Sequence, residues 1–193
     1  MIEGIKNICV FGASSSNIAP KYTDAAYQLG TLMAAEGICC INGAGREGVM
    51  RAVSDGALDA GGKAVGIIPQ FMVDNGWQYE RLPEIIVTSD MHSRKSLMAE
   101  RSDAIVAMPG GCGTFEELME IITWRQLGLF NGLVIIFNVD GYYDDLLHML
   151  ARSIDERFMK ASHSDLWLTA GTAQDVITKL READRNISIE TKY

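Results

Sequence analysis

The stretch AIVAMPGGCGTFEE, residues 104–117, contains the end of one predicted element and the start of the next. Residues 104–107 form a short apolar run, as in a buried strand, and the residues after the glycines have helical character. Gly110, Gly111 and Gly113 lack the Cβ atoms that keep a ligand away from a backbone. The predicted helix directs unpaired N–H groups and its positive dipole end into the same space. The stretch therefore predicts a strand, an anion-binding turn and a helix.

Two carboxylates, Glu116 and Glu117, lie within one turn of this predicted anion site. A carboxylate fixed beside a bound phosphate indicates chemistry on a phosphorylated metabolite, such as a nucleotide. The same residues also match a capping box, in which Thr114 is the N-cap and Glu117 reaches back to its N–H. On that interpretation Glu117 holds a helix end and does no chemistry. These residues alone favour neither interpretation.

The composition is typical of one globular domain. The chain has 193 residues, of which 48% are hydrophobic and 22% are charged, so we expect a single domain over residues 1–193. The formal net charge of −8 argues against a nucleic acid partner, which needs clustered Lys and Arg. No stretch has the length for a membrane span or the pattern of a signal peptide, so no membrane partner is expected.

The cysteines and histidines carry no metal-site pattern. Four cysteines without CxxC spacing are typical of reduced, mostly buried thiols in a cytoplasmic protein, which is the expected location. Cys112 lies at a predicted helix start, where thiolates are favoured, but no histidine is near it in the sequence, so we interpret it as a small filler. The histidines are scattered, and no bound metal is expected.

Short β-rich runs alternate with helical runs along the chain. The predicted strands are residues 5–11, 38–41, 63–68, 84–88, 104–107, 133–137 and 166–169. The predicted helices are residues 20–36, 48–60, 91–101, 115–127, 142–158 and 173–183. Residues 70–81 are predicted to be irregular, and the polar tail after Asp184 is predicted to fray. The alternation predicts an α/β, Rossmann-like doubly wound parallel sheet of about six to seven strands with helices on both faces.

Three loops of small residues follow predicted strands, at residues 12–17, 42–48 and 109–114. Ligands on parallel sheets bind beyond the carboxyl ends of the strands, near the switch in strand order, so these loops are expected to line one crevice. Further candidate ligand contacts in them are Gly12, Ser14, Ser15 and Gly43. The loop after the first predicted strand is not a GxGxxG fingerprint, so it does not indicate NAD binding. The run at residues 43–48 has glycines but no Lys-Ser/Thr after them, so P-loop ATP hydrolysis is not expected.

The predicted helix at residues 91–101 carries a second unusual pattern. Met91, Arg94 and Met98 fall on one helix face, and Lys95 lies beside this stripe. Thioethers against a ring and a fork of donors for oxyanions suit a purine slot, which makes Met91, Lys95 and Met98 candidate substrate contacts. Alternatively, Arg94 and Lys95 are solvated charges while the methionines pack inward. Both interpretations are open at this level.

Taken together, MHSRKSLM (residues 91–98) and PGGCGTFEE (residues 109–117) resemble the RKxxM and PGGxGTxxE motifs of the LOG family, the cytokinin-activating phosphoribohydrolases. The likeness continues through FGASS (11–15), NGAGREGVM (42–50), TWRQLGLF (123–130) and NVDGYYDDLL (138–147). The resemblance implies a Rossmann-like fold, usually homodimeric. It also implies hydrolysis of the N-glycosidic bond of a nucleoside 5′-monophosphate, AMP or an N6-modified AMP, to a free base and ribose 5-phosphate.

By matching positions, the resemblance implies that Arg94 and Glu117 are the catalytic pair. The phosphate contacts that it implies are Gly110, Gly111, Gly113 and Thr114. Many such proteins carry an older lysine decarboxylase label, but nothing in the sequence indicates a pyridoxal phosphate site, and no cofactor is expected. The chain departs from the family at NGAG, residues 42–45, where the family often has GGG. The side chains of Asn42 and Ala44 are expected to narrow the crevice and to affect the base preference.

Two other functions fit the same residues. A nucleotide- or pterin-cofactor-binding carrier on this fold would use the carboxylate of Glu117 only as a helix cap. A glycosyl transferase would move the ribosyl group to an acceptor other than water. Binding without turnover would favour the carrier, and product analysis for ribose 5-phosphate would separate the transferase.

Overall fold

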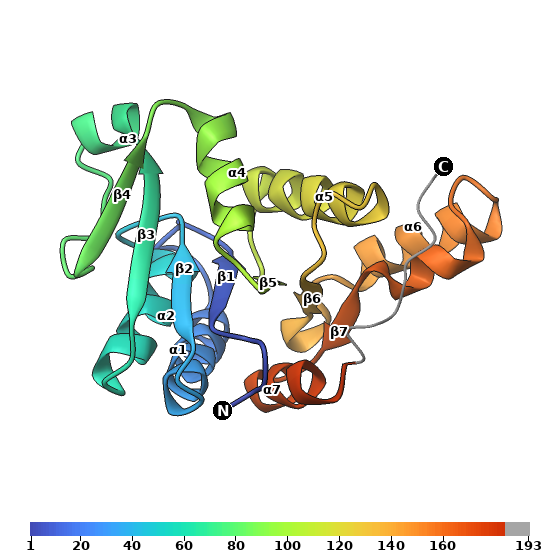
Figure 1. The fold of residues 1–193 in the computed structure, drawn as a ribbon, viewed down its shortest axis with the longest axis horizontal. Helices are drawn as coiled ribbons and strands as arrows, with labels where there is room; N and C mark the ends of the chain where they lie inside the picture. The colour runs from blue at the N-terminus through green and yellow to red at the C-terminus, as the bar shows by residue number, and fades with distance from the viewer. Residues whose placement is uncertain (184–193) are drawn as a thin grey trace.

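Seven parallel strands form the central sheet of the computed structural model, which describes residues 1–183 (Figure 1). The strands are β1 Asn7–Phe11, β2 Cys39–Asn42, β3 Ala64–Pro69, β4 Glu84–Thr88, β5 Ala104–Ala107, β6 Leu133–Phe137 and β7 Leu168–Ala170. Their order across the sheet is β4-β3-β2-β1-β5-β6-β7, and all neighbouring pairs are parallel. The chain thus extends the sheet from β1 in one direction, crosses back, and continues in the other, which confirms the doubly wound prediction.

Helices cover both faces of this sheet (Figure 1). One face packs against α1 Pro20–Ala35, α2 Gly48–Asp59 and α7 Ala173–Glu182. The opposite face packs against α4 Met91–Glu100, α5 Cys112–Gln126 and α6 Asp144–Asp155. The shorter elements are α3 Gln70–Asp74 and the 3₁₀ helices η1 Val139–Gly141 and η2 Ala161–Leu166.

The inner strands are continuous apolar runs because both of their faces are buried. In β1, Ile8 and Val10 face the core beneath α1, α2 and α7. Cys9 and Phe11 face the core beneath α4, α5 and α6. A strand covered on both sides needs apolar residues at consecutive positions rather than at alternate ones. The pattern that predicted the sheet therefore follows from this three-layer packing.

Two glycines allow α1 and α2 to pack closely. A Cβ at Gly30 of α1 would lie 2.2 Å from the carbonyl oxygen of Val53. A Cβ at Gly56 of α2 would lie 2.0 Å from the carbonyl oxygen of Tyr27. Only glycine fits where the two helix backbones touch, and this contact fixes α2 below the loop that follows β2.

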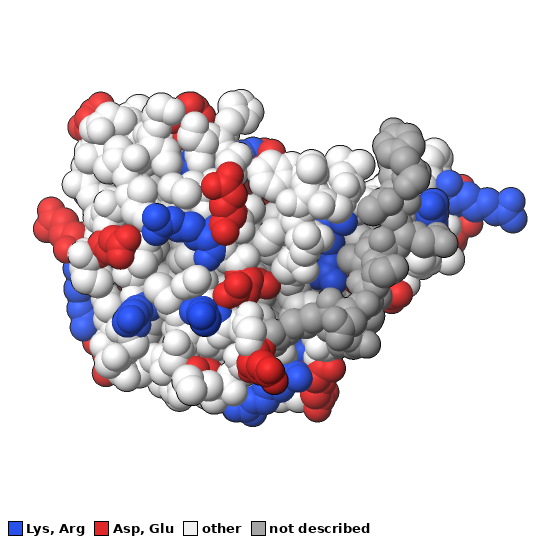
Figure 2. Space-filling model, in the orientation of Figure 1, with Lys and Arg blue, Asp and Glu red and all other residues white. Residues whose placement is uncertain are grey.

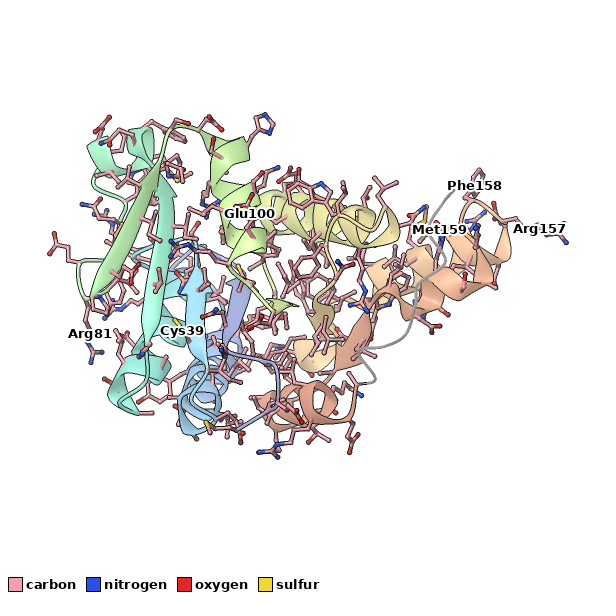
Figure 3. The ribbon with its side chains drawn as sticks, in the orientation of Figure 1. Cys39, Arg81, Glu100, Arg157, Phe158 and Met159 are labelled. Atoms are coloured by element: carbon pink, nitrogen blue, oxygen red, sulfur yellow. The ribbon has the colours of Figure 1, made fainter. Side chains whose placement is uncertain are left out.

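Several elements differ from the prediction, among them α3 and α6. Residues 70–81 contain the helix α3, which was predicted as irregular. The helix predicted over residues 142–158 is shorter, because η1 precedes α6 and α6 ends at Asp155. Arg157 has a φ of 65° and turns the chain there, so Phe158 lies exposed at the outer end of the molecule (Figure 3). The tail after Asp184 lies outside the described residues.

The described surface has mixed charge. Figure 2 shows Lys and Arg side chains among Asp and Glu on the face drawn, without a continuous basic stripe on that face. Arg81, near the β4 edge, contacts Asp55 and Asp59 of α2 (Figure 3). Within residues 1–183, no helix combines the length and the apolar character that a membrane crossing requires.

Candidate active site

A cavity of about 560 Å³ opens at the carboxyl ends of the strands, where the strand order switches between β1 and β5. The loops after β1, β2 and β5 contribute to it, as their small residues predicted. Its lining residues are Gly12, Ala13, Ser14, Gly43, Gly45, Arg46, Glu47, Met50, Ile68, Met72, Trp77, Met91, Arg94, Gly111, Gly113, Thr114, Glu116 and Glu117. Its size is that of a small-molecule site.

The cavity brings most of the predicted site residues together, but four of them do not line it. These are Ser15, Lys95, Met98 and Gly110. Met98 is 1% exposed and packs in the core beneath α4, α5 and α6, so its thioether is not in the cavity wall, contrary to the prediction. Ser15 is exposed, and its hydroxyl accepts a hydrogen bond from the Asn17 N–H. The predicted purine slot on α4 therefore retains only Met91 and Arg94.

Arg94 and Glu117 form a buried ion pair in the cavity wall. The Nη1 of Arg94 donates to Oε1 of Glu117 at 3.0 Å, and the two side chains are 7% and 11% exposed. The Nε of Arg94 donates to the carbonyl oxygen of Ile67, in β3, at 3.0 Å. The guanidinium is thus held between the sheet and α5. The interpretation of Arg94 as a solvated surface charge is wrong.

The carboxyl of Glu117 titrates above its usual range. Burial raises its pKa, and the neighbouring Arg94 guanidinium lowers it by a smaller amount. The charge of Glu116 adds to the increase in pKa. A carboxyl group whose pKa is perturbed by burial in a cleft is a candidate for a chemical role.

Glu117 is also free of the capping role that the sequence allowed. The N-cap of α5 is Gly111, whose carbonyl accepts from the Phe115 N–H at 3.0 Å, and no side chain caps the helix. The helix therefore begins three residues before the predicted start. Thr114 lies inside the first turn, and a Cβ at Gly110 would lie 2.1 Å from its Oγ1. The capping-box interpretation is wrong, because Glu117 is one turn too far along α5.

Lys95 joins α4 to α5 instead of lining the cavity. Its buried ammonium group pairs with Glu116 and lies 3.0 Å from Oε2 of Glu120. These two carboxylates hold the Nζ away from the cavity, so the predicted substrate contact is not formed. Lys95 instead holds Glu116, which lines the cavity next to Glu117.

The start of α4 is fixed by a side-chain cap. The carboxylate of Asp90 accepts from the Ser93 N–H at 2.8 Å, one turn before Arg94. The hydrogen bonds from Ser93 and Ser89 lower the pKa of Asp90 to about 2. A cap of this kind holds the first turn of a helix, and here it sets the position of Arg94.

Two tyrosines hold the glycine loop from the side opposite the cavity. The hydroxyl of Tyr143 donates to the Met108 carbonyl at 2.7 Å, and that of Tyr142 donates to the Gly110 carbonyl at 2.5 Å. Burial raises the pKa of Tyr143, which keeps its hydroxyl a donor. Gly110 therefore supports the loop and does not face the cavity. The sequence reasoning assigned no role to either tyrosine.

Asn42 and Ala44 do not narrow the crevice, contrary to the prediction. The Oδ1 of Asn42 accepts from the Ala44 N–H at 2.9 Å, and its Nδ2 donates to Oγ of Ser54 in α2 at 2.8 Å. Ala44 has a φ of 59°, and its methyl group packs against Gly66 in the core. Both side chains are fully buried below the cavity floor.

Half of the cavity-lining residues were not named individually as candidate contacts. Ala13, Gly45, Arg46 and Glu47 lie in loops that were predicted to line the crevice, and Glu116 was named beside the anion site. The residues that were missed altogether are Met50, Ile68, Met72 and Trp77. Met72 and Trp77 come from residues 70–81, which were predicted to be irregular. The cluster of Phe71, Met72, Val73 and Trp77 was the one available signal, because an irregular surface segment rarely carries so many large apolar residues.

Cysteine and metal chemistry are not indicated at the cavity. Cys112 is a free, exposed thiol at the first position of α5 and does not line the cavity. The sequence predicted mostly buried thiols, but only Cys9 and Cys40 are buried, while Cys39 is half-buried. Burial raises the pKa of Cys40 to about 12. Among residues 1–183, no group of three or more His, Cys, Asp and Glu side chains is arranged to hold a metal ion.

A doubly wound sheet with its cavity at the switch point places the chain in the class of Rossmann-like proteins that bind nucleotides and related phosphorylated ligands. A profile of the family described as possible lysine decarboxylases matches residues 50–180. The chain is 40% identical over 177 residues to the cytokinin riboside 5′-monophosphate phosphoribohydrolase LOG3 of Arabidopsis thaliana, across 92% of this chain and 82% of that protein. The chain belongs to this family, the LOG family, as its motifs predicted.

Further similarities agree with this assignment. A probable cytokinin riboside 5′-monophosphate phosphoribohydrolase, LOGL3 of Oryza sativa subsp. japonica, is 41% identical over 177 residues, across 92% of this chain and 84% of that protein. The structure of the molybdenum cofactor binding protein from Rippkaea orientalis superposes with a TM-score of 0.71. It is 24% identical and covers 91% of this chain and 95% of that one, so this similarity concerns the fold alone.

Proposed function

We propose that this protein hydrolyses the N-glycosidic bond of a nucleoside 5′-monophosphate to a free base and ribose 5-phosphate. The substrate is AMP or an N6-modified AMP of the cytokinin ribotide type, the class named for the relatives from Arabidopsis and rice. The observation that carries the proposal is the buried Arg94–Glu117 pair, which shares a cavity with the bare backbone of Gly111 and Gly113.

The glycine loop is the end of the cavity that suits the 5′-phosphate. Gly111 and Gly113 have no heavy atom within 4 Å of an added Cβ, so open space lies beside their backbone. The first N–H groups of α5 and the Thr114 hydroxyl are available donors at this end, and the helix dipole favours an anion. Binding the phosphate there fixes the position of the sugar. The binding energy of the phosphate is thus used to position C1′, the carbon that reacts.

The ion pair then acts on the anomeric carbon. As the bond from C1′ to the base breaks, its electron pair leaves with the base and the ribosyl group becomes oxocarbenium-like. The Glu117 carboxylate stabilises this cation and takes a proton from the water that attacks C1′. That proton then passes to the departing base, directly or through water, so that the base leaves neutral and Glu117 returns to the carboxylate. Arg94 remains charged throughout, so it acts as a hydrogen-bond donor to substrate oxygens or to the departing base rather than as an acid.

Glu117→Gln tests the proposal with AMP as substrate and chromatography of adenine as the measurement. Losing a general base of this kind lowers a rate on the order of 10²- to 10⁴-fold, so adenine release should fall by at least about 100-fold. Glu100→Gln makes the same change at an exposed position of α4, outside the cavity, and should keep the rate. Adenine release by Glu117→Gln at near the unmodified rate would contradict the assignment.

The same experiment separates the two rival functions. Binding of AMP by the unmodified protein without adenine release over hours would support a carrier. Adenine release without an equal amount of ribose 5-phosphate would support transfer to another acceptor. Equal amounts of both products are expected.

A further inference from the structure

The cavity extends away from the glycine loop toward the β3 side of the sheet. Gly111 and Thr114 follow β5, whereas Met72 and Trp77 follow β3. Three strand spacings separate β5 from β3, which is on the order of 14 Å. Arg94 lies between these ends, because it contacts Ile67 of β3 on one side and Glu117 of α5 on the other. If the phosphate lies at β5 and the sugar at the ion pair, the base points toward β3.

The wall at the β3 end is rich in apolar side chains, and Arg46 and Glu47 of the loop after β2 also line the cavity. Ile68, Met50, Met72 and Met91 line this part of the cavity together with Trp77. Thioethers are polarisable and make favourable contacts with aromatic rings and flexible alkyl groups. The glycine loop presents backbone donors, so the two ends of the cavity suit chemically different halves of one ligand.

Trp77 is held in this wall by backbone contacts. The backbone N–H of Trp77 donates to the Met72 carbonyl at 3.1 Å, and the backbone carbonyl of Trp77 accepts from the Arg46 N–H at 3.2 Å. The guanidinium of Arg46 also donates to the Gly76 carbonyl at 2.9 Å. Gly45 forms an antiparallel bridge with Gln78 on the other side of the tryptophan. The segment after α3 is thereby joined to the loop after β2, and the indole is fixed at the cavity.

The indole has free surface where a ligand can reach it. Trp77 is 48% exposed although it lines the cavity. A large aromatic surface on a tethered segment is a stacking platform for a base, because every base has a π-face. Met72 beside it adds a flexible contact for an alkyl substituent.

We propose that Trp77, with Met72, binds the base and the apolar N6 substituent of the substrate, and so favours N6-alkylated AMP over AMP. This inference rests on the function proposed above, because the orientation of the ligand follows from the ion pair. It assigns the specificity of the site to a segment that supplies no group to the reaction.

Kinetics with three ligands test the assignment. Stacking of a base on an aromatic side chain corresponds to about 5- to 150-fold in affinity. Trp77→Ala should therefore lower kcat/KM for N6-isopentenyl-AMP by at least about tenfold, and lower it less for AMP. Inhibition by ribose 5-phosphate, which has no base, should be unchanged. Trp124→Phe on α5, outside the cavity, is the matched control and should alter none of these values.

Fluorescence gives a readout that needs no turnover. The chain has three tryptophans, and Trp124 and Trp167 lie outside the cavity. In a Glu117→Gln background, N6-isopentenyl-AMP should quench the emission, ribose 5-phosphate should not, and Trp77→Phe should abolish the quench. A quench that survives Trp77→Phe would overturn the inference, as would unchanged kinetics of Trp77→Ala or an equal loss of ribose 5-phosphate affinity. A Trp77-dependent quench without base release by the unmodified protein would support the inference and contradict the hydrolase.

Discussion

At Glu117 two opposing effects act on one carboxyl group, and their balance sets the pH range in which it is charged. Burial favours the neutral form and raises the pKa, while the Arg94 guanidinium favours the carboxylate. The net result is a pKa above the ordinary value of 4.5. Only the carboxylate stabilises a ribosyl cation, so the working form exists above this raised pKa and is lost as the pH falls through it.

We therefore expect kcat/KM to fall on the acid side with an apparent pKa above 4.5. Replacing Arg94 with Met removes the influence that lowers the pKa, so the acid limb of the residual activity should move to higher pH. A pH–rate profile from about pH 4 to about pH 8 measures the apparent pKa of the acid limb in the unmodified protein and in Arg94→Met. An acid limb at or below the ordinary carboxyl value would show that a group other than Glu117 controls the rate.

Gly43 controls the position of the guanidinium. A Cβ at this residue would lie 1.8 Å from Nη2 of Arg94, so Gly43→Ala should move the guanidinium away from Glu117. Because a displacement of about 1 Å at a reacting site costs on the order of 10²-fold, we expect kcat to fall about 100-fold. The free energy of unfolding, measured in urea, should change by less than about 1 kcal/mol, because the long Arg94 side chain can shift.

The control for this substitution is Gly171→Ala. An added Cβ at Gly171 meets nothing within 4 Å, and this residue does not line the cavity. Both kcat and the urea midpoint should stay at their original values. A Gly43→Ala variant with full kcat would show that the pair tolerates displacement, and would weaken the mechanism.

Among the structural elements, the segment that leads into α6 supports the catalytic loop. Tyr142 and Tyr143 follow η1 and reach back to the carbonyls of Gly110 and Met108, on the far side of the loop from the cavity. The conformation of the glycine loop thus depends on residues that lie 32 and 35 positions later in the chain.

Tyr143→Phe should destabilise the protein by about 1–2 kcal/mol, because it leaves the buried Met108 carbonyl without this donor. Tyr142→Phe, at a more exposed position, should leave stability nearly unchanged and raise KM for AMP by about fivefold, the equivalent of one hydrogen bond. Urea unfolding and initial rates measure the two effects. Equal stability of Tyr143→Phe and the unmodified protein would contradict the supporting role.

The elements that the sequence predicted poorly have identifiable physical causes. The start of α5 was misplaced because Thr114 and Glu117 match a capping pattern, whereas the backbone of Gly111 caps the helix without any side chain. The helix α3 was missed because five residues are too few to show a helical period. The helix α1 and the strand β6 were predicted within a residue of their observed bounds, because α1 has a long helical pattern and β6 is a continuous apolar run.

In the candidate site, too, residues in local motifs were identified and residues that depend on tertiary contacts were not. Arg94 and Glu117 were identified through their motifs, and the structure places them in contact. Residues whose role depends on tertiary contacts were missed. Trp77 lines the cavity because its segment pairs with the loop after β2. Tyr142 follows β6 and contacts the glycine loop that follows the neighbouring strand β5. Asn42 was assigned to the crevice because sequence cannot show that its amide turns down toward Ser54.

At the scale of the whole molecule, large apolar side chains lie exposed near the α5 and α6 side of the sheet. Leu129 is 70% exposed, Met149 is 61% exposed and Phe158, at the outer end of the molecule in Figure 3, is 81% exposed. Apolar side chains gathered on one side of a protein are typical of an association surface. We propose that the protein is a homodimer that covers them.

Light scattering with size-exclusion chromatography tests this proposal. The unmodified protein should have twice the chain mass of 21.1 kDa, and Leu129→Glu should shift it toward the monomer. The exposed Leu127→Glu, two residues earlier, reports whether any charge on this surface has the same effect. A monomeric mass for the unmodified protein at micromolar concentration would contradict the proposal.

The joint between the loop after β2 and the segment after α3 has an evolutionary consequence. It is made largely by main-chain groups, so it survives almost any exchange of the side chains that it carries. Arg94 and Glu117 are anchored separately, on α4 and α5. Substitutions in the segment around Trp77 can therefore change which ligand fits the cavity while the Arg94–Glu117 pair is kept. Relatives with this scaffold can thus diverge in the substrates they accept.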